Sequence, residues 1–336
     1  MDNKNNAIKR NASPTSSGWA FQTGAGIFLM LSNIKEFDEI RIEGLDEDIE
    51  ITVGSQKIYA QAKSTSKMGT PNDALSILKK ALESLGDAYL NHKDETKELV
   101  YITNFSNPLC SKYEKMFQTE VFYRMDNLED EDAQKIKERS NSGFPFEKFK
   151  IIILRFNGDN LEKFNIIKEK IKEFLIDAIG DSSFSNRVFD YWYTIFDINA
   201  TDIPTNKKPL CLKKEAIVWP IIDAVFSVDS LSEEEFKKMD NYEDFEQIIQ
   251  TYRSIISTQG LNYEFINRVL NPYFRLKSAN STVDIYTYIN NNWKLFDEEF
   301  TSINDTDIRR CLIKIIMLMI IKKNRKMRMI KEAANL

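Results

Sequence analysis

The order of secondary-structure patterns in the first third of the chain constrains its fold most. A helix, three short strands, a second helix and a fourth strand are expected over residues 18–32, 39–43, 48–53, 57–63, 72–85 and 99–104. Short turns between the first three strands favour an antiparallel meander. The second helix makes the next connection a crossover, so the fourth strand should run parallel to the third. A last strand is expected over residues 150–156, after an acidic stretch (126–138) that we interpret as a solvated helix or insertion. The pattern predicts an α/β core with a mixed central sheet flanked by helices.

Polar side chains gather on one face of this expected sheet. Alternation along a strand places Asp48 and Glu50 on the same face, and it does the same for Gln61 and Lys63 in the next strand. Glu43 stands at the end of the first strand. The polar rows of neighbouring strands can therefore face one cleft.

The first helix contains two glycines, Gly24 and Gly26, which each cost about 1 kcal/mol relative to alanine. A helix tolerates them most readily where another element packs closely against it. We therefore expect this helix to lie tightly on the sheet, with Gln22 pointing into the cleft.

Beyond residue 160 the pattern becomes helical. Apolar residues at helical spacing form a stripe that ends at Gly180: Phe164, Ile167, Ile171, Phe174 and Ala178. Further helices are expected over residues 185–196, 213–226, 242–257, 262–270, 284–296 and 305–331. We expect a flexible tail over residues 1–17, an α/β domain over 18–160, and an all-α regulatory or partner-docking domain over 161–336.

Composition and charge exclude several classes of site. The 336-residue chain has a net charge of −5, so any binding to nucleic acid has to come from a local basic strip or a bound metal. The single histidine, His92, excludes zinc sites built from several histidines and phosphodiesterases that use a histidine pair. It lies in a polar run, and we interpret it as a solvated side chain.

Cysteine spacing and hydropathy point to a cytoplasmic protein. Cys110, Cys211 and Cys311 lie about a hundred residues apart, which fits neither a zinc knuckle nor a disulfide framework and favours reduced thiols. The polar N-terminal segment lacks the apolar region of a signal peptide. The longest strongly apolar stretch, residues 315–321, is too short to span a bilayer, so no membrane partner is expected.

The clustered polar residues are suited to phosphodiester hydrolysis with a hard cation. Mg²⁺ prefers oxygen ligands and keeps several waters, so one or two carboxylates suffice to hold it. Asp48 would be its principal ligand, completed by the side chain of Gln61 and the backbone carbonyl of Ala62. Lys63 would orient the attacking water and stabilise charge on the phosphate. Glu43 would bind a second ion or orient a water, and Gln22 would reach a phosphate or a metal-bound water.

Four segments resemble the PD-(D/E)xK superfamily, which has the restriction-endonuclease-like fold. They are residues 18–22, 42–49, 61–64 and 101–104, so the resemblance covers roughly the first 105 residues. The chain is most similar to the branch of double-stranded-DNA endonuclease effector domains of bacterial anti-phage systems, including CBASS and Lamassu. The resemblance implies a DNA endonuclease that depends on Mg²⁺ or Mn²⁺. Asp48, Gln61 and Lys63 would form its active centre, supported by Gln22 and Glu43.

The same resemblance implies control by other proteins. A helical second half that docks on a partner, such as an SMC-like ATPase, fits Lamassu effectors better than a CBASS effector that senses a nucleotide itself. Activation by homo-oligomerisation is also expected.

Several alternatives stay open at this point. Gln61 stands where the superfamily has its second acidic residue, which puts a second metal in doubt and leaves room for a non-catalytic assembly subunit that retains the fold. A sequence-specific restriction enzyme is another reading. Glu50 is either an extra ligand or a charge at the rim of the site. The basic segment 322–328 either contacts DNA phosphates or is the solvated half of a last helix.

Overall fold

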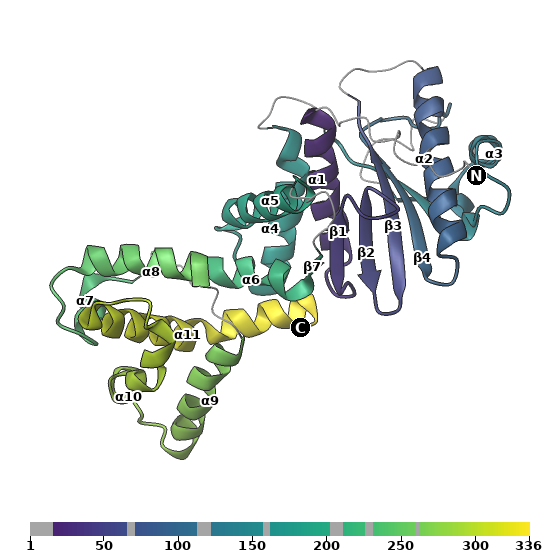
Figure 1. The fold of residues 1–336 in the computed structure, drawn as a ribbon. Coiled ribbons are helices and arrows are strands. Elements are labelled where there is room, and N and C mark those ends of the chain that lie inside the picture. The colour runs from purple at the N-terminus through teal and green to yellow at the C-terminus, as the bar shows by residue number, and fades with distance from the viewer. Residues whose placement is uncertain are drawn as a thin grey trace, which may run out of the picture. The chain divides into compact units, whose positions relative to one another are not determined.

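The computed structural model describes residues 16–65, 71–112, 122–156, 162–201, 211–225, 231–259 and 263–336. The chain divides into two compact units (Figure 1). The first extends to Ile217 and includes Asn335, and the second extends from Val218 to Ala334 and includes Leu336. Of the expected tail, only residues 16 and 17 are described, and they begin the first helix. The domain boundary expected near residue 160 falls inside the first unit.

The first unit is built on a seven-stranded mixed sheet in the order β5-β6-β4-β3-β2-β1-β7. The strands are β1 (Glu39–Ile42), β2 (Ile49–Val53), β3 (Gln56–Lys63), β4 (Thr96–Thr103), β5 (Phe122–Arg124), β6 (Phe149–Ile153) and β7 (Leu212–Lys213). Strands β1, β2 and β3 form the expected antiparallel meander. Strand β4 is parallel to β3, as the crossover predicts, and β6 is parallel to β4. The predicted α/β fold class is confirmed.

Helix α1 (Ser16–Ser32) packs closely on one face of the sheet. A Cβ atom at Gly26 would collide with Ile42 of β1 and would lie 3.1 Å from the Phe196 ring. At Gly24 it would meet the Phe156 ring at 3.4 Å. The two glycines therefore permit the close approach that was predicted for this helix. Helices α4 (Asn165–Ile179) and α5 (Ser185–Thr201) both pack against α1, which places them in the first unit.

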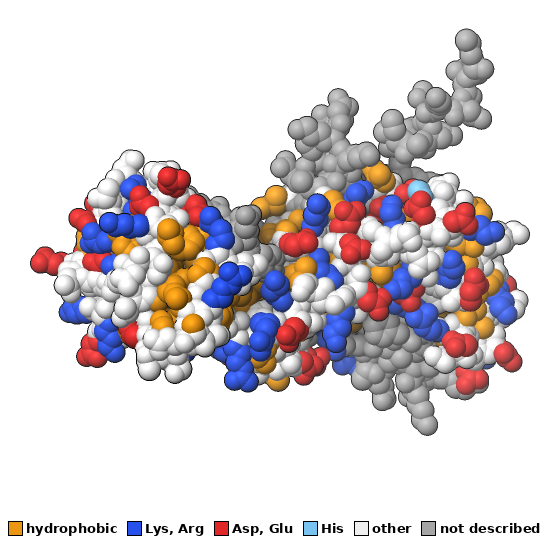
Figure 2. Space-filling model, turned by 90° about the horizontal axis from the view of Figure 1, so that it is seen from below, with side chains coloured by type: hydrophobic (Ala, Val, Ile, Leu, Met, Phe, Trp, Pro, Cys, Tyr) orange, Lys and Arg blue, Asp and Glu red, His pale blue; other side chains and the backbone are white. Residues whose placement is uncertain are grey.

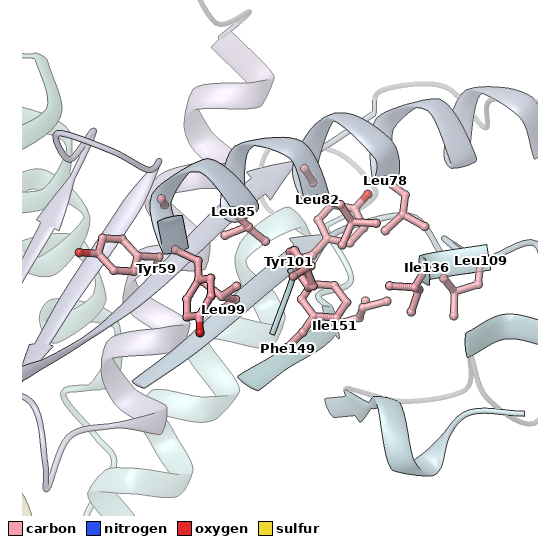
Figure 3. Close-up of a cluster of buried hydrophobic side chains, with 14 of the residues drawn as sticks. Tyr59, Leu78, Leu82, Leu85, Leu99, Tyr101, Leu109, Ile136, Phe149 and Ile151 are labelled. Carbon is pink, nitrogen blue, oxygen red and sulfur yellow. The ribbon is translucent and has the colours of Figure 1, made fainter. Parts of the chain in front are cut away.

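Helix α2 (Pro71–Asn91) covers the opposite face of the sheet. Its leucines 78, 82 and 85 pack on residues of β3, β4 and β6, including Tyr59 and Tyr101, in a fully buried cluster (Figure 3). Ile136 of α3 (Asp130–Lys137) belongs to the same cluster. The expected end of this helix at residue 85 was wrong. Helix α2 continues for a further turn because Ala88 and Tyr89 extend its buried stripe.

The second unit is mostly helical, as expected for the C-terminal region. It contains the end of α6 (Lys214–Val225), α7 (Glu233–Lys237), α8 (Phe245–Gln259), α9 (Tyr263–Ala279), α10 (Ile285–Asn292), a 3-10 helix (Trp293–Phe300) and α11 (Thr306–Ala334). Helix α11 is the central element, because every side chain from Cys311 to Ile321 is buried and α8, α9 and α10 pack around it. The Lys314 ammonium lies in this core, 2.9 Å from Asp240 Oδ2, and Arg310 pairs with the same carboxylate.

The basic segment 322–328 lies on the last turns of α11. Met327 is buried, whereas Lys322, Arg325 and Arg328 are exposed, and Lys322 pairs with Glu235. Within the described ranges, no helix is both long and apolar enough to cross a bilayer. Basic and acidic side chains are interspersed over the face of the molecule in Figure 2. This mixture fits the small net negative charge of the chain.

Candidate active site

Asp48 is the centre of the candidate site. It lies in the bend between β1 and β2, one residue before β2 begins. Its Oδ2 atom accepts hydrogen bonds from the Gln61 side-chain amide, from the Ala62 backbone N–H at 3.0 Å and from the Lys63 ammonium at 3.3 Å. The structure therefore brings together Asp48, Gln61 and Lys63, the three residues that the sequence placed in the active centre.

The end of strand β3 presents these partners to Asp48. The pairing of β2 with β3 ends at Ile49 and Ala60. Beyond that pair the Ala62 N–H donates to the Asp48 carboxylate, while β4 continues to pair with β3 on its other side up to Lys63 and Thr103. The side chain of Lys63 is 38% exposed and that of Asp48 is 21% exposed, so a ligand can reach both.

Gln22 and Glu43 hold the backbone of Asp48 from the other direction. The Gln22 amide nitrogen, which is buried, donates to Glu43 Oε1 at 2.8 Å and to the Asp48 carbonyl at 3.1 Å. The Glu43 N–H also donates to that carbonyl, at 2.8 Å. Glu43 adopts a left-handed backbone conformation with φ of 52°, which is uncommon for a residue other than glycine and marks a tightly held turn.

The electrostatics of this corner raise the pKa of Glu43. Burial is the main cause, and the negative charge of Asp48 acts in the same direction. The hydrogen bond from Gln22 and the charge of Lys63 oppose the shift without reversing it. Glu43 therefore keeps a proton more readily than an exposed glutamate does.

Glu47 was not predicted as a site residue, yet it borders the same site. It is only 5% exposed, and neither of its carboxylate oxygens has a hydrogen-bond partner of good geometry among the described residues. Burial and the negative charge of Asp48 raise the pKa of Glu47 to about 8, although the nearby Ser84 hydroxyl and Lys63 favour the charged form. A charged residue in a loop gives no sequence pattern that reports its burial, so only the packing of α2 beside the loop reveals it.

Glu50 is neither the extra ligand nor the rim charge that were considered. It is 3% exposed, and its Oε1 accepts a hydrogen bond from the Asp46 N–H at 2.9 Å. Its side chain fills the space beside Gly44, where any Cβ atom would collide with it. Glu50 therefore supports the 43–48 loop from inside.

Two further residues tie neighbouring chain segments to this loop and to β3. His92 is half-buried rather than solvated, because its Nε2 lies 2.9 Å from Asp46 Oδ2 and its ring stacks on Tyr59. Asn104, just after β4, bonds both backbone groups of Thr65, with its Oδ1 accepting from the N–H at 2.8 Å and its Nδ2 donating to the carbonyl at 2.9 Å. This pair of bonds fixes the chain two residues beyond Lys63.

The residues present fit a divalent cation held by few carboxylates. Within the described residues, no three acidic, histidine or cysteine side chains are grouped closely enough to hold an ion. The available groups are the Asp48 carboxylate, the Gln61 amide, which also carries an acceptor oxygen, and the unpartnered carboxylate of Glu47. A cation with several water ligands, such as Mg²⁺, suits this donor set better than a fully dehydrated one.

The comparisons with known proteins give one distant likeness of fold. No protein-family model matches the chain, and no curated protein matches it. Among solved structures, the chain is similar to the Acinetobacter baumannii Cap4 SAVED/CARF-domain containing receptor with the cyclic trinucleotide 2'3'3'-cAAA, with a TM-score of 0.40 and 11% identity. The match covers 74% of this chain and 60% of that one, so this chain spans less than two thirds of the receptor.

Proposed function

We propose that the chain is a metal-dependent endonuclease of double-stranded DNA. The observation that supports this best is that a side-chain amide, a backbone N–H and an ammonium group all donate to one carboxylate oxygen, Asp48 Oδ2. The motif segments that resemble the PD-(D/E)xK superfamily supply these same residues. This pairing of motif and geometry supports catalytic roles for Asp48, Gln61 and Lys63.

Each residue has a distinct role in the proposed reaction. A divalent cation supplies neutralisation of phosphate charge and a more acidic water when bound. Asp48, with Gln61 and the Ala62 carbonyl, would hold it. The Lys63 ammonium would leave Asp48 and bind a phosphate oxygen instead, where it would stabilise the negative charge that develops. Gln22 and Glu43 keep the backbone of Asp48 in place through the Asp48 carbonyl.

Removal of the ammonium group tests the proposal. The Lys63→Ala variant should cut linear double-stranded DNA in Mg²⁺ at a rate lower by about 100-fold or more, the loss typical for one preorganised charge-stabilising group. Lys57→Ala is the matched control, because Lys57 lies on the same strand with its ammonium over the Tyr59 ring. A folded Lys63→Ala protein that cuts at the wild-type rate would refute the catalytic assignment.

We further propose that the nuclease serves as an effector in bacterial anti-phage defence. Its activity would be released by a partner such as an SMC-like ATPase complex, or by homo-oligomerisation. The resemblance of the motif segments to Lamassu and CBASS effector domains supports this. Cutting by the purified chain should be slow alone and faster when the partner is added. Sequencing of the cut ends would show a fixed recognition motif if the chain is instead a restriction enzyme.

The neutral Gln61 favours one alternative, a non-catalytic subunit that keeps the fold to bind DNA or a partner. Calorimetric titration with Mg²⁺ or Mn²⁺ separates the two functions. If the wild type binds metal and Asp48→Asn does not, the result supports the nuclease. An absence of metal binding, both alone and with partner proteins, supports the subunit.

A further inference from the structure

A buried carboxylate without a partner lies beside the candidate active site. Among the buried side chains of the described residues, Glu47 is the one carboxylate whose two oxygens both lack a hydrogen-bond partner. Buried polar groups in proteins are almost always hydrogen-bonded, and buried charges are paired or bind metals. The Ser84 hydroxyl lies nearby without a hydrogen bond of good geometry, so a single neutral donor is all that the described surroundings offer this charge besides Lys63.

The neighbouring charges do not supply that group. Asp46 and Asp48 are both acidic and act on Glu47 by repulsion. Lys63 is the cation whose charge favours ionised Glu47, but its ammonium is directed to Asp48 Oδ2 at 3.3 Å. Lys63 therefore leaves the charge of Glu47 without a direct partner. A small cation would give the Glu47 carboxylate a direct partner and would also offset its repulsion from Asp46 and Asp48.

A comparison with Glu50 shows how a buried carboxylate with a structural role differs from Glu47. Glu47 lies in the bend before β2 and Glu50 lies in β2, and both are almost fully buried. Glu50 has a structural role, since its Oε1 accepts the Asp46 N–H and its side chain occupies the space left by Gly44. Glu47 makes no such bond. Its burial therefore needs a different explanation.

The backbone conformation permits the side chains of Glu47 and Asp48 to bind the same ion. Adjacent residues of a strand point to opposite faces, but residues 45–48 form a bend before β2 begins. A bend, unlike a strand, does not force these two consecutive side chains onto opposite faces, and the charge of Asp48 acts on Glu47. The strict alternation of a strand therefore does not apply to residues 47 and 48.

We propose that Glu47 is the second carboxylate of the divalent-cation site, supplying the negative charge that the neutral Gln61 does not. This inference rests on the proposed function. The site would then contain two acidic ligands from consecutive positions, Glu47 and Asp48, with the Gln61 amide opposite them. Two carboxylates lie within the range of one or two that binds Mg²⁺ with several retained waters.

Binding of Mn²⁺ alone to the full chain tests the assignment without any measurement of cutting. Free Mn²⁺ is measured by electron paramagnetic resonance for the wild type and for Glu47→Gln, Asp48→Asn and Glu50→Gln. Asp48→Asn should abolish binding, and Glu47→Gln should weaken it by about tenfold or more, as expected for loss of a group that supports a metal site. Glu50→Gln, which removes an equally buried charge nearby, should change the affinity by less than about threefold.

Two further measurements guard against misfolding. The thermal midpoint of Glu47→Gln in a chelator should match or exceed that of the wild type, while its rise on addition of Mn²⁺ should be smaller. Glu47→Asp, which keeps the charge on a shorter side chain, should recover part of the affinity.

The outcomes distinguish the two proposals. If Asp48→Asn loses Mn²⁺ and Glu47→Gln binds like the wild type, the metal site stands and the role of Glu47 is overturned. Equal weakening by Glu47→Gln and Glu50→Gln would also overturn it, since that result indicates a general field of negative charge. If the wild type binds no Mn²⁺, both alone and with partner proteins, or if Asp48→Asn binds it unchanged, both proposals fail.

Discussion

The replacement of Glu47 by glutamine should change how the stability of the metal-free protein depends on pH. Burial and the charge of Asp48 raise the pKa of this carboxyl from 4.5 to about 8 in the folded protein. The folded state therefore keeps a proton that the unfolded chain releases. The stabilisation is fully present below about pH 4.5, and it is lost as the pH rises through about 8.

The size of the effect follows from the number of protons involved. Between pH 5 and pH 7 the folded wild type holds nearly one more proton than the unfolded chain. Each pH unit then changes the free energy of unfolding by about 1.36 kcal/mol, so the wild type should lose roughly 2.5 kcal/mol over this range relative to Glu47→Gln. The glutamine has a similar shape and does not titrate.

Urea unfolding of both proteins in a chelator, at pH 5, 6 and 7, measures this difference directly. Groups that do not interact with Glu47 are present in both proteins and cancel in the comparison. The free energy of unfolding of the wild type should fall below that of the variant as the pH rises. Parallel pH profiles would show that Glu47 has an ordinary pKa in the folded state, and the argument from its burial would fail.

Three other predictions concern packing, positioning and the second unit. Gly26→Ala should destabilise the protein by about 1–2 kcal/mol in thermal unfolding, because overpacking against Ile42 exceeds the gain in helix propensity, while Gly24→Ala should be close to neutral. Asn104→Ala, which frees the backbone of Thr65, should lower the DNA cutting rate about tenfold in a nuclease assay while Mn²⁺ still binds. Lys314→Met should lower the free energy of unfolding by about 3 kcal/mol in urea, because it removes one of two cations from the Asp240 carboxylate, whereas Lys322→Met at an exposed pair should change it by less than about 1 kcal/mol.

Much of the first unit could be predicted from sequence because its elements are long or strongly patterned. The helix-meander-crossover order determined which strands are antiparallel and which are parallel. Strict alternation placed Gln61 and Lys63 on the face that meets Asp48. Strands β5 and β7 were missed, since runs of two or three residues are too short to show any periodicity.

The remaining errors have a common physical cause, which is that burial by tertiary packing is not visible in local pattern. Glu47, Glu50 and His92 are polar residues in polar runs, and each is covered by elements distant in sequence. The break in pattern near residue 160 marks the change from alternating strands and helices to mostly helical structure, and the first unit continues beyond it to Ile217. Helices α4 and α5 follow that break but pack on α1, so they complete the layer that supports the site.

Asp48 is anchored by two layers of the first unit, the sheet and helix α1. Its carboxylate is held by the end of β3, and its carbonyl is held by Gln22 of α1. Because Trp19 of the same helix also donates a hydrogen bond to Asp197 of α5, a rigid displacement of α1 pulls on the loop that carries Asp48. A shift of one ångström in this helical layer would break the hydrogen bond from Gln22 to the Asp48 carbonyl, and the backbone that carries the carboxylate would lose that support.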